Sequence, residues 1–203
     1  KKIDSIIDGA AAEHGVDPAL MRTYAKIESG GDPTNQTGSY KGLFQLSAAE
    51  FRKYGGTGDI FDPQANAQAA ARKLKAESDE LAAKLGRQPT PTELYMVHQQ
   101  GEGGAAAHWA NPGAPAWINM ASTAEGRAKG PGWAKAAIWG NVPDDVKARY
   151  GSVDNITSQQ FTDMWRDKYA RLSGNAVAPA PTGALPPPAP QMAAPQGPAS
   201  NAG

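Results

Sequence analysis

The sequence predicts an all-α fold, mostly helical with at most a small β-hairpin. Signals that start helices are frequent: proline follows aspartate at Asp17 and Asp62, and capping boxes open at Ser47, Thr90 and Thr157. Apolar residues recur at helical spacing after these starts, whereas signals for strands are sparse. Frequent helix starts and few strand signals together predict the fold class.

The starts and stops also predict the order of the helices. A first amphipathic helix ends near Gly15, and a second begins at Asp17 and stops at a pair of glycines and a proline. A third runs from the Ser47 capping box towards Tyr54, and a long alanine-rich helix closes at Gly86. Further helices start at the capping boxes of Thr90 and Thr157. For the segment after the second helix, residues 31–45, we expect a loop or a small hairpin. For residues 111–150 we expect irregular segments and short helices.

A change of composition at Gly174 divides the chain. Residues 174–203 contain eight prolines and no charged or aromatic residue. Such a segment cannot bury enough apolar surface to offset its ordering entropy, so it predicts a polyproline-like tail or linker. We therefore expect one domain over residues 1–173. The first residue is not methionine, and we expect a processed or excised piece that the tail joins to a larger protein or assembly.

Composition excludes several classes of function. The 203 residues include 20 basic and 20 acidic ones, so a net charge of zero argues against nucleic acid as a partner. No apolar run approaches the ~20 residues of a membrane span. The absence of cysteine excludes disulfides, zinc–thiolate sites and thiol nucleophiles, and the three histidines are scattered. We expect neither a metal nor a cofactor.

The five tryptophans are expected mostly in the core. Trp165 lies on a clear apolar helical stripe with Phe161, Met164 and Tyr169, so its burial is the firmest of these expectations. The alternative role for the others is to line a binding groove; these are Trp109, Trp117, Trp133 and Trp139.

Glu28 is the candidate catalytic residue. It follows Leu20 and Tyr24 at intervals of four, so it lies on the apolar side of the second helix, close to that helix's C-terminal end. Burial and the negative end of the helix dipole both disfavour a carboxylate, which predicts a glutamate that keeps its proton near neutral pH. A protonated glutamate is a general acid suited to expelling a sugar oxygen. The alternative is a residue at the helix end that bends into solvent.

The residues around Glu28 resemble the soluble lytic transglycosylase family. Three features carry the resemblance: ESGGDP at residues 28–33, GLFQ at residues 42–45, and the alanine-rich helix opened by Asp62. The resemblance covers about residues 3–110, with residues 111–173 as a helical extension. It implies a lysozyme-like fold and peptidoglycan glycan strands as substrate.

The resemblance also implies roles for individual residues. Glu28 would protonate the oxygen between MurNAc and GlcNAc and then accept a proton from the C6 hydroxyl, giving a 1,6-anhydro product. Ser29 would orient the acid or the substrate, and Gln45 would donate hydrogen bonds to the sugar. Gly42 fits a loop close to the sugar. Tyr40 and Phe44 would line the groove or simply pack in the core.

The third motif departs from the family pattern. Many members have Ala-Tyr-Asn-x-Gly, where this chain has VHQQG at residues 97–101, so His98 replaces the tyrosine and Gln99 the asparagine. The resemblance implies substrate contacts for both residues. The alternative is a polar helix end packed on a loop.

Three other interpretations stay open. Asp32 or Glu102 could activate water, which would make the protein a lysozyme-type hydrolase, a muramidase; Glu50 and Asp59 are weaker candidates for this role, and Glu102 is expected in a glycine-rich turn. The domain could also bind peptidoglycan without cleaving it, as a structural module. A phage virion component or an exported, secretion-associated enzyme are further expectations, all acting in the bacterial periplasm or cell wall.

Overall fold

A computed structural model describes residues 2–174, which form two compact units, residues 2–94 and 95–174. The fold is mostly helical with one small antiparallel hairpin, as predicted. The predicted proline-rich tail lies, apart from Gly174, outside the described residues.

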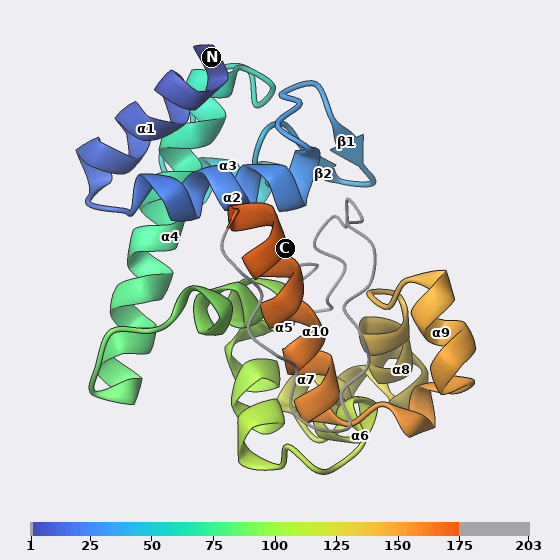
Figure 1. The fold of residues 1–203 in the computed structure, drawn as a ribbon. Helices are drawn as coiled ribbons and strands as arrows, with labels where there is room; N and C mark the ends of the chain where they lie inside the picture. Colours follow the sequence, from blue (N-terminus) through green and yellow to red (C-terminus); the bar gives the residue numbers. More distant parts are fainter. Residues whose placement is uncertain (1, 175–203) are drawn as a thin grey trace. The chain divides into compact units, whose positions relative to one another are not determined.

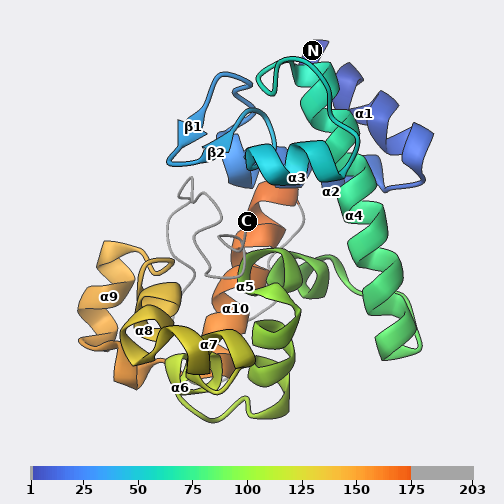
Figure 2. The same ribbon diagram turned by 180° about the vertical axis from the view of Figure 1, so that it is seen from behind.

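The first unit contains four helices and the hairpin (Figures 1 and 2). Helix α1 packs against α2 and α4, and α3 also packs on α4. The hairpin follows α2 and pairs Thr37 with Tyr40. The bounds are α1 Lys2–His14, α2 Pro18–Ser29, β1 Gln36–Thr37, β2 Tyr40–Lys41, α3 Ala48–Lys53 and α4 Pro63–Leu85.

The helices of the first unit begin where the sequence predicts. The carboxylate of Asp17 accepts a hydrogen bond from Ala19 N, and that of Asp62 accepts one from Ala65 N, each at 3.0 Å. Ser47 and Glu50 form both hydrogen bonds of a capping box. These caps satisfy backbone N–H groups that have no partner inside the helix, so they define the starts of α2, α3 and α4.

Helix α5 (Pro91–Ala110) is interrupted at Gly101, whose φ of 73° and ψ of 168° are not helical. This conformation is accessible mainly to glycine and divides α5 into two helical segments. Residues 102–104 belong to the second segment, so the expected turn around Glu102 is wrong: one glycine makes the kink and the next residues resume the helix.

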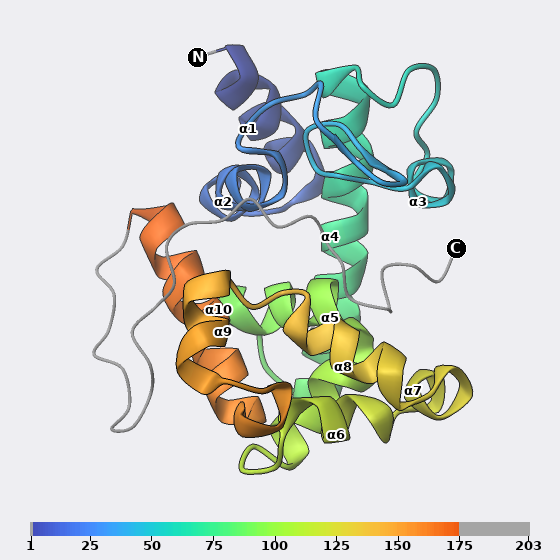
Figure 3. The ribbon, with the colours of Figure 1, turned by 90° about the vertical axis from the view of Figure 1, so that its right-hand side faces the viewer.

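The second unit contains the rest of α5 and a set of mostly short helices (Figure 3). Helix α6 packs against α7, α8 and α10. Short helices across 111–150 agree with the prediction. The bounds are α6 Ala116–Ala121, α7 Ala124–Lys129, α8 Pro131–Trp139, α9 Asp144–Tyr150, the 3₁₀ helix η1 Val153–Asn155 and α10 Ser158–Ser173.

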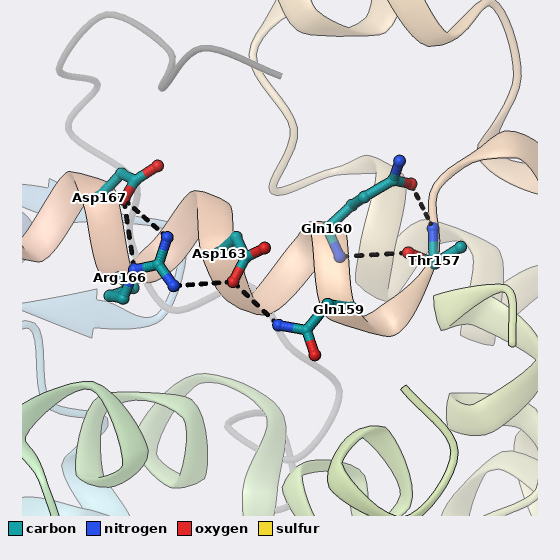
Figure 4. Close-up of polar contacts among 6 residues, drawn as sticks. All are labelled: Thr157, Gln159, Gln160, Asp163, Arg166 and Asp167. Carbon is teal, nitrogen blue, oxygen red and sulfur yellow. Dashed lines mark hydrogen bonds and ion pairs between the residues drawn. The ribbon is translucent and has the colours of Figure 1, made fainter. Parts of the chain in front are cut away.

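Helix α10 carries buried acidic residues that share one arginine (Figure 4). Arg166 Nη1 lies 3.0 Å from Asp163 Oδ1, and Arg166 Nη2 lies 3.2 Å from Asp167 Oδ1. The capping box of Thr157 and Gln160 starts the helix, as predicted. Because buried carboxylates are costly without a partner, Arg166 makes this part of α10 compatible with burial.

The prediction that most tryptophans lie in the core is wrong. Trp165 is 1% exposed, but the other four are only half-buried. Lys135 lies 4.6 Å from the Trp117 ring centroid, and Lys129 and Lys147 approach Trp133 and Trp139 in the same way. Three of these four rings therefore each have a lysine ammonium group close to the ring.

Among the helices between residues 2 and 174, none combines the length and apolarity that a bilayer crossing requires.

Candidate active site

Glu28 lies at the end of α2 and is 1% exposed. The helix ends immediately after Ser29, because Gly30 adopts a left-handed conformation with a φ of 68°. Its N–H donates to Lys26 O at 3.0 Å, and the N–H of Gly31 donates to Ala25 O at 3.2 Å. This glycine cap ends α2 two residues after Glu28, so Glu28 is still part of the helix and its side chain stays on the buried face. The predicted burial of Glu28 is confirmed.

Ser29 connects this helix end to the loop that carries GLFQ. Its hydroxyl lies 2.7 Å from Leu43 O and 3.1 Å from Ala25 O. Ser29 and Leu43 are both buried, so water cannot replace the bond to Leu43. The structure thus brings residues 28–29 and 42–45 together, as their separate motifs suggested.

Gln45 is buried within the same loop and has a φ of 50°. Its Nε2 donates to Gly42 O at 2.8 Å and to Asn35 O at 2.9 Å. Both partners are carbonyl oxygens, so the NH₂ group must face them and both of its hydrogens are used. Gln45 Oε1 is buried and has no hydrogen-bond partner among residues 2–174. The group of this side chain that has no partner is therefore an acceptor, whereas donation to a sugar was expected.

Asn66 anchors the loop, and sequence reasoning missed it. It is fully buried on α4; its Oδ1 accepts from Phe44 N at 2.8 Å, and its Nδ2 donates to Lys41 O and Ile60 O at 3.1 and 2.9 Å. A signal in the sequence could have found Asn66: it is a polar residue on the alanine-rich face of a helix, as Glu28 is a polar residue on an apolar face.

Gly42 is required by the close approach of Asn66. Its φ is 81°, and a Cβ at this position would lie 2.4 Å from Asn66 Nδ2 and 2.8 Å from Ile60 O. The glycine thus lets the loop approach α4, in addition to any approach to a ligand.

Tyr40 and Phe44, the two predicted groove residues, are each 3% exposed. Tyr40 pairs with Thr37 in the hairpin, and Phe44 is held through its backbone by Asn66. Packing accounts for both positions, and little ring surface remains for a sugar.

Lys73 is a buried cation on α4 that the sequence analysis did not select. Its Nζ lies 3.3 Å from Glu50 Oε2 and 3.7 Å from Glu77 Oε1. Burial alone would lower the pKa of Lys73, but the charges of Glu77, Glu50 and Glu28 raise it above its usual value. Glu28 therefore lies within the electrostatic range of a lysine that stays charged.

His98 and Gln99 belong to the second unit, unlike the other predicted site residues. His98 is half-buried, with its ring centroid 6.0 Å from that of Tyr95. Gln99 is fully buried; its Nε2 donates to Tyr95 Oη at 3.3 Å, and its Oε1 makes no hydrogen bond within the described chain.

A buried polar network follows this motif, and sequence reasoning also missed it. Asn119 Nδ2 donates to Ser158 Oγ at 2.8 Å, and Ser158 Oγ lies 2.5 Å from His108 Nδ1. His108 Nε2 lies 3.2 Å from Gln100 Oε1, an acceptor, so the neutral imidazole carries its proton on Nε2 and accepts from Ser158. Desolvation lowers the pKa of His108 to about 4.

The other carboxylates considered have separate roles. Asp32 is exposed, and hydrogen bonds from the hydroxyl and the backbone N–H of Thr34 lower its pKa. Asp59 is exposed and caps Phe61 N, and Glu50 is paired with Lys73. Glu102 lies in the second unit. Within residues 2–174, no group of three or more histidine or acidic residues could hold a metal ion.

Comparison with known families identifies the class of this domain. Residues 5–95 match the family described as "Transglycosylase SLT domain", so this part of the chain is a transglycosylase SLT domain. The match contains Glu28, Ser29 and the GLFQ loop, and it ends before His98 and Gln99.

The SLT domain indicates an enzyme of the lytic transglycosylase class that has peptidoglycan as its substrate and acts at the cell wall or in the periplasm. No curated protein matches the chain. No comparison supports an association with a phage or with secretion.

Proposed function

We propose that this domain is a lytic transglycosylase that cleaves the β-1,4 bond between MurNAc and GlcNAc and forms 1,6-anhydro-MurNAc. The observation that carries the proposal is the buried carboxyl group of Glu28 at the C-terminal end of α2, inside the SLT segment. Burial and the helix dipole both favour the protonated carboxyl group over the carboxylate.

The reaction needs one acid that works twice. Glu28 donates its proton to the bridging oxygen as the bond from that oxygen to MurNAc C1 breaks. The resulting carboxylate then accepts the proton of the MurNAc C6 hydroxyl, whose oxygen forms the new bond to C1. The nucleophile comes from the substrate, so the second carboxylate of an ordinary glycosidase is not needed.

Two neighbours support this sequence of steps. Ser29, bonded to Leu43, holds the end of α2 against the GLFQ loop and so limits the positions open to Glu28. Lys73 stabilises the charged form that Glu28 takes between its two proton transfers, since the two groups interact electrostatically.

Hydrolysis is the second candidate and requires a carboxylate that activates water. Asp32, its main candidate in the first unit, is exposed and already bonded to Thr34. Glu50, a weaker candidate, is paired with Lys73. This arrangement favours the transglycosylase. A domain that only holds peptidoglycan is the non-enzymatic candidate.

Mass spectrometry of fragments released from purified sacculi tests all three candidates. We expect anhydro-muropeptides, which are about 18 Da lighter than hydrolytic products. Glu28→Gln should bind sacculi and release nothing, whereas Glu80→Gln, a change at an exposed glutamate of α4, should behave as wild type. Hydrolytic masses would replace the proposal by a muramidase. Release by Glu28→Gln, or binding without release by wild type, would refute it.

A further inference from the structure

We propose that a pocket next to the GLFQ loop binds the peptide stem of peptidoglycan through the stem's carboxylate and amino groups. This inference rests on the proposed substrate and concerns a part of it that the glycosidic reaction does not touch. The pocket has a volume of about 630 Å³ and lies in the first unit, where the end of the hairpin, α3 and the loop after α3 meet.

Two cations that have no counter-ion within residues 2–174 line this pocket. Lys41 and Arg52 form no salt bridge and no side-chain hydrogen bond with any residue between 2 and 174. By contrast, Arg22 pairs with Asp8, and Lys73 with Glu50. Two positive groups that line one pocket favour a ligand with carboxylates, which peptide stems carry at acidic side chains and at their C-terminal end.

The rest of the lining favours a peptide over a simple polyanion. Asp59 places a carboxylate on the same pocket; its Oδ1 accepts from Phe61 N at 2.9 Å, and its second oxygen is available to an ammonium group. Stems contain a diamino acid that supplies such a group. Phe51 and Ile60 add apolar surface for alanine methyl groups. Mixed charge with apolar surface matches a stem better than a phosphate polymer.

Asn66, which anchors the GLFQ loop, also forms hydrogen bonds with two residues that line the pocket. Asn66 donates to Lys41 O and to Ile60 O on the pocket side, and it accepts from Phe44 N on the loop side. Gly56 packs closely on Phe51: a Cβ at this glycine would lie only 2.4 Å from the ring. These contacts fix the pocket before a ligand arrives and so reduce the entropy lost on binding.

The covalent structure of the substrate keeps a stem close to the bond that is cut. Each stem is attached to the MurNAc whose bond is cut, and Lys41 directly precedes Gly42 of the GLFQ loop. A stem held by Lys41 and Arg52 would therefore help to position the sugar that carries it. The predicted consequence is a preference for glycan strands that keep their stems.

A binding titration tests the pocket without any catalysis. The probe is the free stem tetrapeptide released from sacculi by an amidase. We expect wild type to bind it and the Lys41→Gln/Arg52→Gln double variant to bind about tenfold more weakly, since the variant loses two ion pairs with the stem. Lys53→Gln is the matched control, because it removes a cation of α3 that does not line the pocket. No binding by wild type, or equal binding by the double variant, would overturn the proposal.

Asp59→Asn gives a second readout that keeps the cap on Phe61 N. This variant should bind the native stem more weakly than wild type does, yet bind a stem with an acetylated amino group as well as wild type does. An equal loss with both stems would overturn the role of Asp59 and the mixed-charge argument.

A cleavage assay separates this inference from the proposed function. Wild type and the double variant are compared on sacculi and on glycan strands stripped of stems, with melting curves to confirm folding. We expect the double variant to be slower on sacculi only. An equal loss on both substrates would mean that the pocket binds glycan and would refute the inference. If wild type cleaves neither substrate, the proposed function fails, and the titration alone decides the pocket.

Discussion

Ser29 donates its hydroxyl proton to the carbonyl oxygen of Leu43 at 2.7 Å, across 14 positions of sequence. The contact with Ala25 O in the same helix is longer, at 3.1 Å, and the hydroxyl has one proton, so the Leu43 bond is the better one. This hydrogen bond connects the residue next to Glu28 with the middle of the GLFQ loop.

Ser29→Ala tests the importance of this connection. The change leaves the buried Leu43 carbonyl without its donor, so we expect the free energy of unfolding to fall by about 1–2 kcal/mol. We also expect release of muropeptides to slow by about tenfold, because Glu28 and the loop are held less firmly. Urea unfolding and a release assay measure the two effects.

Thr23→Val is the control for Ser29→Ala. Thr23 is also buried in α2, and its hydroxyl donates to Ala19 O at 2.9 Å without contacting the loop. We expect a similar or smaller loss of stability and normal release. Equal effects of the two variants on release would show that α2 only needs to be stable.

Gly42→Ala and Gly38→Ala separate backbone strain from close packing. Both glycines have positive φ values, 81° and 60°, but a Cβ at Gly38 meets no atom within 4 Å, whereas one at Gly42 meets Asn66 and Ile60. Gly38→Ala should cost about 1 kcal/mol from conformation alone. Gly42→Ala should cost about 3 kcal/mol, since Asn66 must also move away from its hydrogen bonds. Equal midpoints in urea would argue against Asn66 as the anchor.

His108 predicts a dependence of stability on pH. Its pKa in the folded protein is about 4, below the usual 6.5, because burial disfavours the imidazolium. The unfolded chain therefore takes up a proton at higher pH than the folded one does. The stabilisation is complete above about pH 6.5 and is lost as the pH falls towards 4, by on the order of 3 kcal/mol.

Urea unfolding between pH 4 and pH 7.5 measures this loss. His108→Gln should reduce the slope of stability against pH in that window, although it lowers stability at neutral pH through the lost bond to Ser158. An unchanged slope in His108→Gln would contradict the assignment.

Local signals in the sequence were sufficient for the helices and for the burial of Glu28. The caps at Asp17, Ser47, Asp62, Thr90 and Thr157 each involve side chains and N–H groups within one turn, so neighbouring residues alone decide them. Burial of Glu28 follows from helical periodicity, which is equally local.

Contacts between distant residues required the tertiary structure. The tryptophans illustrate this: helical spacing indicated Trp165, but Trp117, Trp133 and Trp139 occur in short helices where periodicity carries little information. Gly101 marks a kink and not a turn, because the chain continues as a helix after it.

The sequence by itself determined the helical class, the family resemblance and the acidic residue at the end of α2. Only the tertiary structure decided that Asn66 anchors the GLFQ loop and that backbone carbonyl oxygens take both donors of Gln45. It also decided that Lys41 and Arg52 have no ion-pair partner among residues 2–174. The physical reason is that a hydrogen bond or an ion pair is assigned by which groups meet after the chain has packed. Asn66 and Phe44, which are 22 positions apart, carry no periodic signal of that meeting.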